Sequence, residues 1–320
     1  MAVRKKQFAR PLVAAVLGAS CGSCLPLYRV LHKPPSPPVI AFIPRTSGTT
    51  FTEDMHRGAV DAAKRAGYQI YWNAPTRDDD LDRQIRIAEG AVRDGARALI
   101  LGPTNIWGLN TMVNHLTSTG FPVVFVQTGP AEPPGPHLTS ITPDQEKFGE
   151  LAAARVALVT GGSGEVAIVG IDRGTPETLA RAVSFLRSIA AYPGIRVVAE
   201  SPGAVQTMEA EQSTREVVSA YPRLKAIFAV SADATQGAML ALEDVDPHPA
   251  VSLIGSDRDL FLIDGLDSNE IDSLVTSDGY QIGYRAVQVA LVGIAGRPMP
   301  PPQQVEVELL TRGNIVPDRR

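Results

Sequence analysis

Cysteine is nearly absent from this sequence, which has only Cys21 and Cys24 among its 320 residues. Both lie near the start, so the rest of the chain has no disulfide framework and no thiolate nucleophile. The pair spells Cys-x-x-Cys, but a redox dithiol needs a helix N-terminus inside a fold, whereas these cysteines end a basic and apolar leader. A redox function is therefore disfavoured.

Long apolar runs, excess positive charge and clustered histidines are also lacking. No apolar run approaches the roughly 18 residues that a membrane-spanning helix needs, and the net charge of -4 gives no basic field to attract nucleic acid. The five histidines are scattered, with no two at metal-ligand spacing and none beside an obvious nucleophile. We therefore expect no nucleic-acid partner, no metal and no cofactor, and a hydrolase has no support.

The first 24 residues differ from the rest of the chain and are expected to form a signal segment. A basic start at 4–10 and an apolar run at 12–17 precede small residues, a pattern typical of secretory signals. Its end resembles a bacterial lipoprotein signal, in which Cys21 would become the acylated first residue, although Gly18 stands where a leucine is usual. The proline-rich residues 25–38 would then form a stiff, extended tether.

The fold is expected to be organised around residues 39–67, where a strand, a polar loop and a helix follow one another. Residues 39–43 are continuously apolar, as in a parallel strand that is buried on both faces. Thr50 and Glu53 form a capping-box signature, and apolar residues then recur at helical spacing up to Gly67. The donor-rich loop 45–49 lies at the carboxyl end of a strand, where open α/β sheets bind ligands.

Strand-like and helix-like runs alternate from residue 39 onward, which predicts mainly parallel sheets with helices on both faces. Further strands are expected at 69–73, 98–101, 122–126, 166–169, 196–199, 226–230, 251–254, 271–276 and 304–309. Helices are expected at 81–92, 109–116, 148–159 and 280–294. The proline-rich residues 129–137 are expected to form a surface loop. The chain therefore divides into two similar α/β halves.

Several motifs, taken in order, resemble those of a known family. They are GAVDAAKRAGYQI, DLDRQIRIAEGAVRDGARALILGPTN and GFPVVFV in the first half, and YPRLKAIFAVSADATQGAMLAL, VSLIGSD and DGYQIGYRAVQVAL in the second. This series resembles the sugar-binding type I periplasmic binding proteins, the ribose-binding class, over residues 39–310.

The resemblance implies two doubly wound α/β domains that close on a ligand through three crossovers. These would fall near residues 140–143, 277–279 and 300–303. The first domain would comprise 39–141 plus 278–301, and the second 142–277 plus 302–312, followed by a tail at 313–320.

The resemblance also implies which residues face the ligand. Arg45 and Phe51 match the opening loop, and Asp257 keeps a family carboxylate. Other positions depart from the usual identity: Gln127 replaces an Asp, Leu179 an Arg, Ser231 and Ala232 an Asn-Asp pair, and Ser277 a Gln or Asp. Trp107, after the third strand, is a candidate for stacking on a ligand.

These candidates have plainer interpretations as well. Asp257 ends a strand and could cap the helix that follows. Arg45 could be solvated in its polar loop. Trp107 and Phe51 could simply cover apolar surface.

The sequence therefore predicts a monomeric solute-binding protein of an ABC-type importer. It would bind a small, carbohydrate-like solute, deliver it to a membrane permease and reside in the periplasm or at the cell surface on a lipid anchor. A sensor read by a membrane receptor or histidine kinase is the main alternative, and an enzyme on the same fold is another. A transcription repressor is disfavoured because a leader stands where a helix-turn-helix would be needed.

Acylation of Cys21 is directly testable. The wild-type protein should fractionate with membranes and carry lipid by mass spectrometry, because buried acyl chains bind it to the bilayer. Cys21→Ala should release it into the aqueous fraction, whereas Cys24→Ala should keep the lipid. A wild-type protein without lipid, or a Cys21→Ala protein still on the membrane, would show that this anchor does not exist.

Overall fold

The computed structural model describes residues 36–77, 80–172, 175–202, 206–244 and 251–315. Residues from Pro38 onward form one compact unit. The expected leader, including Cys21, and most of the expected tether lie outside the described residues. Within the described ranges, no helix is both long and apolar enough to cross a membrane.

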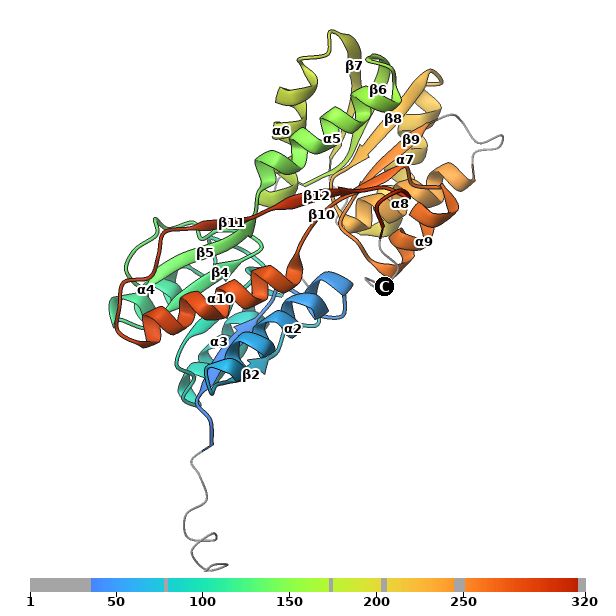
Figure 1. The fold of residues 1–320 in the computed structure, drawn as a ribbon. Coiled ribbons are helices and arrows are strands. Elements are labelled where there is room, and N and C mark those ends of the chain that lie inside the picture. Colours follow the sequence, from blue (N-terminus) through green and yellow to red (C-terminus); the bar gives the residue numbers. More distant parts are fainter. Residues whose placement is uncertain (1–35, 78–79, 173–174, 203–205, 245–250, 316–320) are drawn as a thin grey trace, which may run out of the picture. The chain divides into compact units, whose positions relative to one another are not determined.

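The first sheet contains six parallel strands in the order β11-β5-β4-β3-β1-β2 (Figure 1). The strands are β1 (Val39–Ile43), β2 (Gln69–Trp72), β3 (Leu99–Leu101), β4 (Val123–Val126), β5 (Leu138–Pro143) and β11 (Gln303–Val305). Ile40 and Phe42 of β1 pack with α2 (Thr50–Arg65) and α10 (Gly279–Ile294). Ala41 and Ile43 pack on the opposite face with α3 (Leu81–Arg93) and α4 (Asn110–Ser118). This two-sided burial explains why β1 is apolar at every position.

The second sheet has the order β12-β10-β9-β8-β6-β7. Its strands are β6 (Ser163–Ile171), β7 (Gly194–Pro202), β8 (Leu224–Ala229), β9 (Ser252–Ser256), β10 (Ser273–Ser277) and β12 (Val307–Leu310), of which β12 is antiparallel to β10. One face packs on α5 (Gln145–Val159) and α6 (Pro176–Ile189). The other packs on α7 (Thr207–Ala220), α8 (Ala232–Glu243) and α9 (Leu260–Ser268). The predicted fold class, two doubly wound α/β domains, is confirmed.

We call the first sheet with its helices the first half, and the second sheet with its helices the second half. Among the described residues the chain passes between them three times, at Asp144, Asp278 and Glu306. The expected single strand 304–309 is instead two strands joined by Glu306, as the successive arrows β11 and β12 in Figure 1 show. Residues 303–305 therefore pair with β5 in the first half.

Several of the helices begin at a residue whose side chain accepts a hydrogen bond from a free N–H group of the first turn. Asp80, Asp144, Ser231 and Asp278 each accept a hydrogen bond from the backbone N–H three residues later. The expected capping box at Thr50 and Glu53 was wrong by one residue. Thr49 is the N-cap of α2, and its hydroxyl accepts from the N–H of Thr52, whose own hydroxyl accepts from the N–H of Thr49. Thr52 thus fills the position that the sequence pattern assigned to a glutamate.

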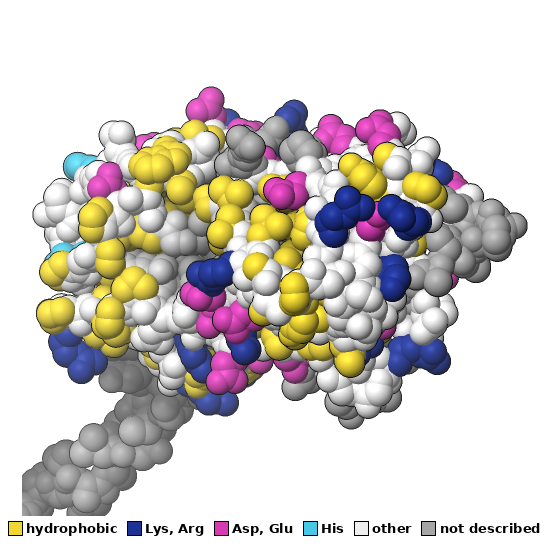
Figure 2. All heavy atoms as spheres, turned by 90° about the horizontal axis from the view of Figure 1, so that it is seen from above, with side chains coloured by type: hydrophobic (Ala, Val, Ile, Leu, Met, Phe, Trp, Pro, Cys, Tyr) yellow, Lys and Arg dark blue, Asp and Glu magenta, His cyan; other side chains and the backbone are white. Residues whose placement is uncertain are grey.

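Charged side chains of both signs are intermixed on the face shown in Figure 2. A face of mixed sign has no broad basic field of the kind that attracts nucleic acid. This arrangement agrees with the net charge of -4.

Helices α2 and α10 approach each other closely at two glycines. An ideal Cβ on Gly283 would lie 1.9 Å from the carbonyl oxygen of Met55, and one on Gly58 would lie 2.1 Å from that of Tyr280. Because α2 begins directly after the loop at Arg45, and α10 directly after a passage between the halves, this contact fixes both segments relative to the first sheet.

Gly283→Ala should force these helices apart. We expect the free energy of unfolding in urea to fall by about 1–3 kcal/mol or more, the usual cost of overpacking. Gly90→Ala in α3 is the matched control, since the nearest atom to its Cβ would be Arg93 Nη2 at 3.9 Å. The free energy of unfolding of that variant should rise by about 0.5–1 kcal/mol, because alanine lowers the entropy of the unfolded chain and has a higher helix propensity than glycine. Equal stabilities of the two variants would contradict the close contact.

Candidate functional site

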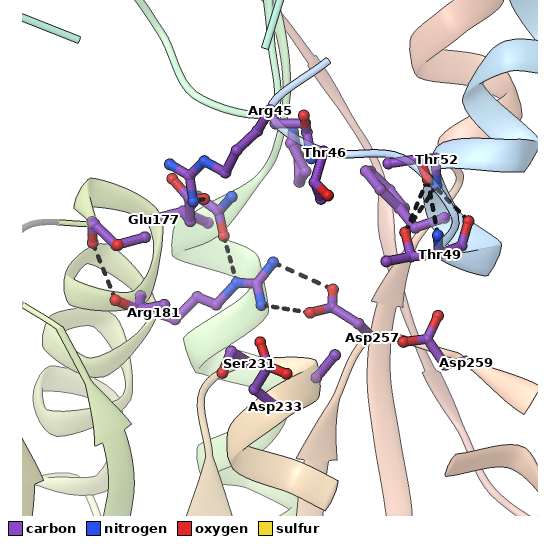
Figure 3. A pocket seen from close by; sticks show the side chains of 17 residues that line it. Arg45, Thr46, Thr49, Thr52, Glu177, Arg181, Ser231, Asp233, Asp257 and Asp259 are labelled. Atoms are coloured by element: carbon purple, nitrogen blue, oxygen red, sulfur yellow. Dashed lines mark hydrogen bonds and ion pairs between the residues drawn. The ribbon is translucent and has the colours of Figure 1, made fainter. Parts of the chain in front are cut away.

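A cavity of about 190 Å³ lies between the two halves, where loops from the carboxyl ends of both sheets meet (Figure 3). The first half contributes the loop after β1 and Gln127 after β4. The second half contributes the first turn of α6 and the loops after β8 and β9. Parallel strands bring their carboxyl ends to one edge of a sheet, so residues far apart in the sequence converge here.

Five of the predicted ligand residues line this cavity: Arg45, Phe51, Gln127, Ser231 and Asp257. Trp107 and Ser277 do not. The side chain of Trp107 is 69% exposed, and Ser277 is buried and lines a neighbouring cavity together with Asp54 and Arg258. A ligand-binding role for these two residues stays a prediction from the sequence alone.

Arg181 is a cavity residue that the sequence analysis missed. Its side chain is only 7% exposed, and its donors are directed to three partners. Nε donates to Gln145 Oε1 at 2.9 Å, Nη1 donates to the carbonyl oxygen of Val230 at 3.0 Å and to Asp257 Oδ2 at 3.2 Å, and Nη2 donates to Asp257 Oδ1 at 3.4 Å. The guanidinium also lies 3.9 Å from the centre of the Phe148 ring, a cation–π contact.

Leu179, which the resemblance matched to a family arginine, and Arg181 lie two residues apart on α6 and point to different sides of the helix. Leu179 lies on the exposed side of α6, whereas Arg181 shares the buried side with Ala182, Phe185 and Ile189. The helical spacing of these apolar residues was visible in the sequence. It would have placed Arg181 on the inward face, where a charged group requires partners.

Asp257 and Gln127 both have backbone angles that residues with a side chain rarely adopt. Their φ values are 68° and 67°, in the left-handed region. Such strain persists only where the surrounding structure enforces it, and it is concentrated at functional sites. Gln127 Oε1 is buried and has no hydrogen-bond partner among the described residues. Asp257 does not cap α9, because Asp259 occupies that N-cap position, so the capping interpretation of Asp257 is wrong.

Arg45 is not solvated, contrary to the plainer interpretation of its polar loop. Its Nη1 lies 3.0 Å from Glu177 Oε1, and its Nε donates to the carbonyl oxygen of Pro103 at 3.0 Å. The other carboxylate oxygen of Glu177 accepts a hydrogen bond from the hydroxyl of Thr128. Arg45 and Thr128 belong to the first half and Glu177 to the second, so these bonds join the two halves across the cavity.

Two further side chains complete the polar lining. The Ser231 hydroxyl accepts from the N–H of Ala234 and so caps α8. Asp259 Oδ1 accepts from the backbone N–H of Thr50 at 3.1 Å, which is another bond between the halves. Burial raises the pKa of Asp259 above its usual value and the charge of Asp257 adds to this, although the hydrogen bond from Thr50 opposes the shift.

The arrangement is suited to holding a small polar molecule. Carboxylates, hydroxyls and the amides of Gln127 and Gln145 provide several hydrogen-bonding groups, and Phe51 provides an aromatic ring. Within the described residues, no three or more His, Cys, Asp or Glu side chains are grouped so that they could hold a metal ion.

The first and second halves are both doubly wound, are joined by three passages and enclose a polar cavity. This construction defines the class of two-domain binding proteins. The family described as periplasmic binding protein domain matches residues 40–298. The chain belongs to this family, and the resemblance deduced from its motifs is confirmed.

Individual relatives are distant but extend over most of the chain. The D-ribose/D-allose-binding protein of Pseudomonas aeruginosa is 25% identical over 303 residues, which cover 92% of this chain and 93% of that protein. The xylitol-binding protein of Mycolicibacterium smegmatis is 23% identical over 221 residues, or 69% of this chain and 61% of that protein. The structure of an ABC transporter solute-binding protein from Agrobacterium vitis, bound with alpha-D-tagatopyranose, has a TM-score of 0.80 at 22% identity, with 88% and 96% of the chains covered. That likeness shows the fold.

Replacing Arg181 should destabilise the protein because it leaves Asp257 partly buried without its counter-charge. We expect Arg181→Met to lower the free energy of unfolding by about 3–5 kcal/mol. Arg187→Met is the matched control on the same helix, because Arg187 pairs with Glu146 at 2.6 Å on the exposed surface. That exposed pair should contribute about 0–1 kcal/mol. Urea unfolding of both variants decides the matter, and similar losses would mean that Arg181 is not a required counter-charge.

Proposed function

We propose that this protein is the solute-binding component of an ABC-type importer, and that its cavity binds a small, uncharged or weakly charged solute rich in hydroxyl groups. The observation that carries this proposal is the cavity itself, enclosed by two halves and lined by hydrogen-bonding side chains at the carboxyl ends of both sheets. Relatives named for ribose, allose and xylitol support a carbohydrate-like ligand.

Asp257 is the residue that we assign the central role in binding. Arg181 holds both of its carboxylate oxygens in place, so the group is oriented before a ligand arrives. Each carboxylate oxygen has a further lone pair that can accept a hydrogen bond from a ligand hydroxyl. Phe51 would pack on the C–H face of a sugar, and the hydroxyl groups of the lining would complete the contacts.

Binding would bring the two halves together. Three thin passages join them, which is the usual construction of a hinge, and the bonds from Glu177 and Asp259 cross the cavity in the arrangement described here. A solute that fills the cavity would add contacts to both sides and so favour closure. The permease would then receive the closed, loaded protein.

Membership of the periplasmic binding protein family supports a periplasmic location. We propose in addition that Cys21 anchors it to the membrane and that it acts as a monomer. The proline-rich residues before β1 would then serve as the tether between anchor and binding unit.

A thermal-shift screen of the full chain against pentoses, hexoses and polyols tests this function, followed by calorimetry on the ligands that raise the melting temperature. Asp257→Asn should weaken binding by about tenfold to a hundredfold, as expected for the loss of a charge-assisted hydrogen bond. A screen in which no member raises the melting temperature would contradict the proposal.

Asp272→Asn provides the matched control. Asp272 forms a similar two-oxygen pair with Arg155 in the same half, and its side chain is 23% exposed compared with 22% for Asp257. Both variants should lose stability, because each leaves an arginine without its full counter-charge. Affinity should fall in Asp257→Asn alone, and equal affinities in the two variants would assign Asp257 a purely structural role.

A further inference from the structure

Two arginines among the described residues, Arg45 and Arg181, line the cavity, and arginine is the side chain best suited to bind carboxylate or phosphate groups. From the residue types alone, the cavity would be expected to take an anionic sugar. The contacts of the two guanidinium groups indicate the opposite.

Arg181 has little capacity left for a ligand. It is almost fully buried, its donors bond to Gln145, Val230 and Asp257, and the ring of Phe148 covers its guanidinium plane. Its charge is balanced by Asp257. An anionic ligand could not reach this guanidinium without displacing Asp257.

Arg45 is neutralised in the same way, but by a residue of the opposite half. Glu177 is fixed by three features: the ion pair with Arg45, the hydrogen bond from Thr128 and its position in the first turn of α6, where a negative charge is favoured. Among the described side chains that line the cavity, each guanidinium group is matched by a carboxylate, Arg45 by Glu177 and Arg181 by Asp257. A bound anion would therefore find neither guanidinium free, and taking Arg45 from Glu177 would leave a largely buried carboxylate without its partner.

We propose that Glu177 determines the charge specificity of this cavity: by neutralising Arg45, it makes the site accept uncharged polyhydroxyl solutes and reject sugar acids and sugar phosphates. This inference rests on the proposed function and narrows its substrate class. It assigns Glu177 a role that is distinct from direct hydrogen bonding to the ligand. Removing the charge of Glu177, without changing its size, should free Arg45 to bind an anion.

The test compares D-galactose and D-glucose with D-galacturonate and D-glucuronate, in which a carboxylate replaces one CH₂OH group, and adds inorganic phosphate as a probe without sugar shape. In the wild-type full chain, calorimetry should show each uronate binding at least about tenfold more weakly than its parent sugar. In Glu177→Gln the ratio of uronate affinity to parent-sugar affinity should rise by about tenfold or more. Phosphate, which should not stabilise the wild type, should raise the melting temperature of this variant.

Glu146→Gln is the matched control. Glu146 occupies the second position of α5, as Glu177 does in α6, and it also pairs with an arginine, but on the exposed surface outside the cavity. The substitution changes the net charge of the protein equally. It should leave the ratio of uronate to sugar affinity at the wild-type value.

Arg45→Gln provides an independent test if Glu177→Gln does not fold. It leaves the negative charge of Glu177 uncompensated. The affinity for D-galactosamine, which carries a positive ammonium group, should therefore rise by about tenfold relative to the affinity for D-galactose. Uronates that bind the wild type as tightly as their parent sugars would overturn the inference. An unchanged ratio of uronate to sugar affinity in Glu177→Gln would also overturn it. Where that variant does not fold, the inference would be overturned if D-galactosamine did not bind Arg45→Gln more tightly, relative to D-galactose, than it binds the wild type. A wild type that binds no sugar, combined with a Glu177→Gln protein that gains phosphate, would refute the proposed function and leave the role of Glu177 supported.

Discussion

The site depends on one constraint, which is that the charge of Arg181 is buried and must be balanced where it lies. Its guanidinium has Asp257 as counter-charge and Gln145, Val230 and Phe148 as further contacts. These partners come from α5, the end of β8 and the end of β9, so satisfying one side chain fixes the relative positions of three elements at the edge of the cavity. The carboxylate of Asp257, which lines the cavity, is bonded to Arg181 through both oxygens, and its backbone lies in the left-handed region that is concentrated at functional sites.

Much of the fold could be predicted from the sequence, because buried parallel strands and amphipathic helices leave strong periodic signals. The apolar run of β1 and the polar loop after it indicated a segment that lines the cavity in the structure. The last strand could not be resolved, since a short alternating run does not specify which sheet each part joins, and one residue, Glu306, separates β11 from β12. The capping box was misplaced because a threonine, Thr52, can replace the glutamate of the usual pattern.

The residues that line the cavity divide into those that the sequence could place and those that it could not. Gln127 and Asp257 follow strands directly and Arg45 follows β1 after one residue, so their positions at the carboxyl edge could be deduced from chain order. Arg181 and Glu177 lie within α6, where only the angular position around the helix brings a residue to the cavity. Their pairing with Asp257 and Arg45 connects residues 76 and 132 positions apart, which no local pattern encodes. The balance of charge within the cavity, on which the proposed charge specificity rests, is visible only from these pairs.

A crystal structure of the full chain with the tightest neutral sugar from the screen tests the central claim most directly. The account predicts the sugar between the two halves, with a hydroxyl within hydrogen-bond distance of Asp257 and with the pair between Arg45 and Glu177 intact. A sugar bound outside this cavity, or one seated on Arg45 with Glu177 displaced, would contradict it.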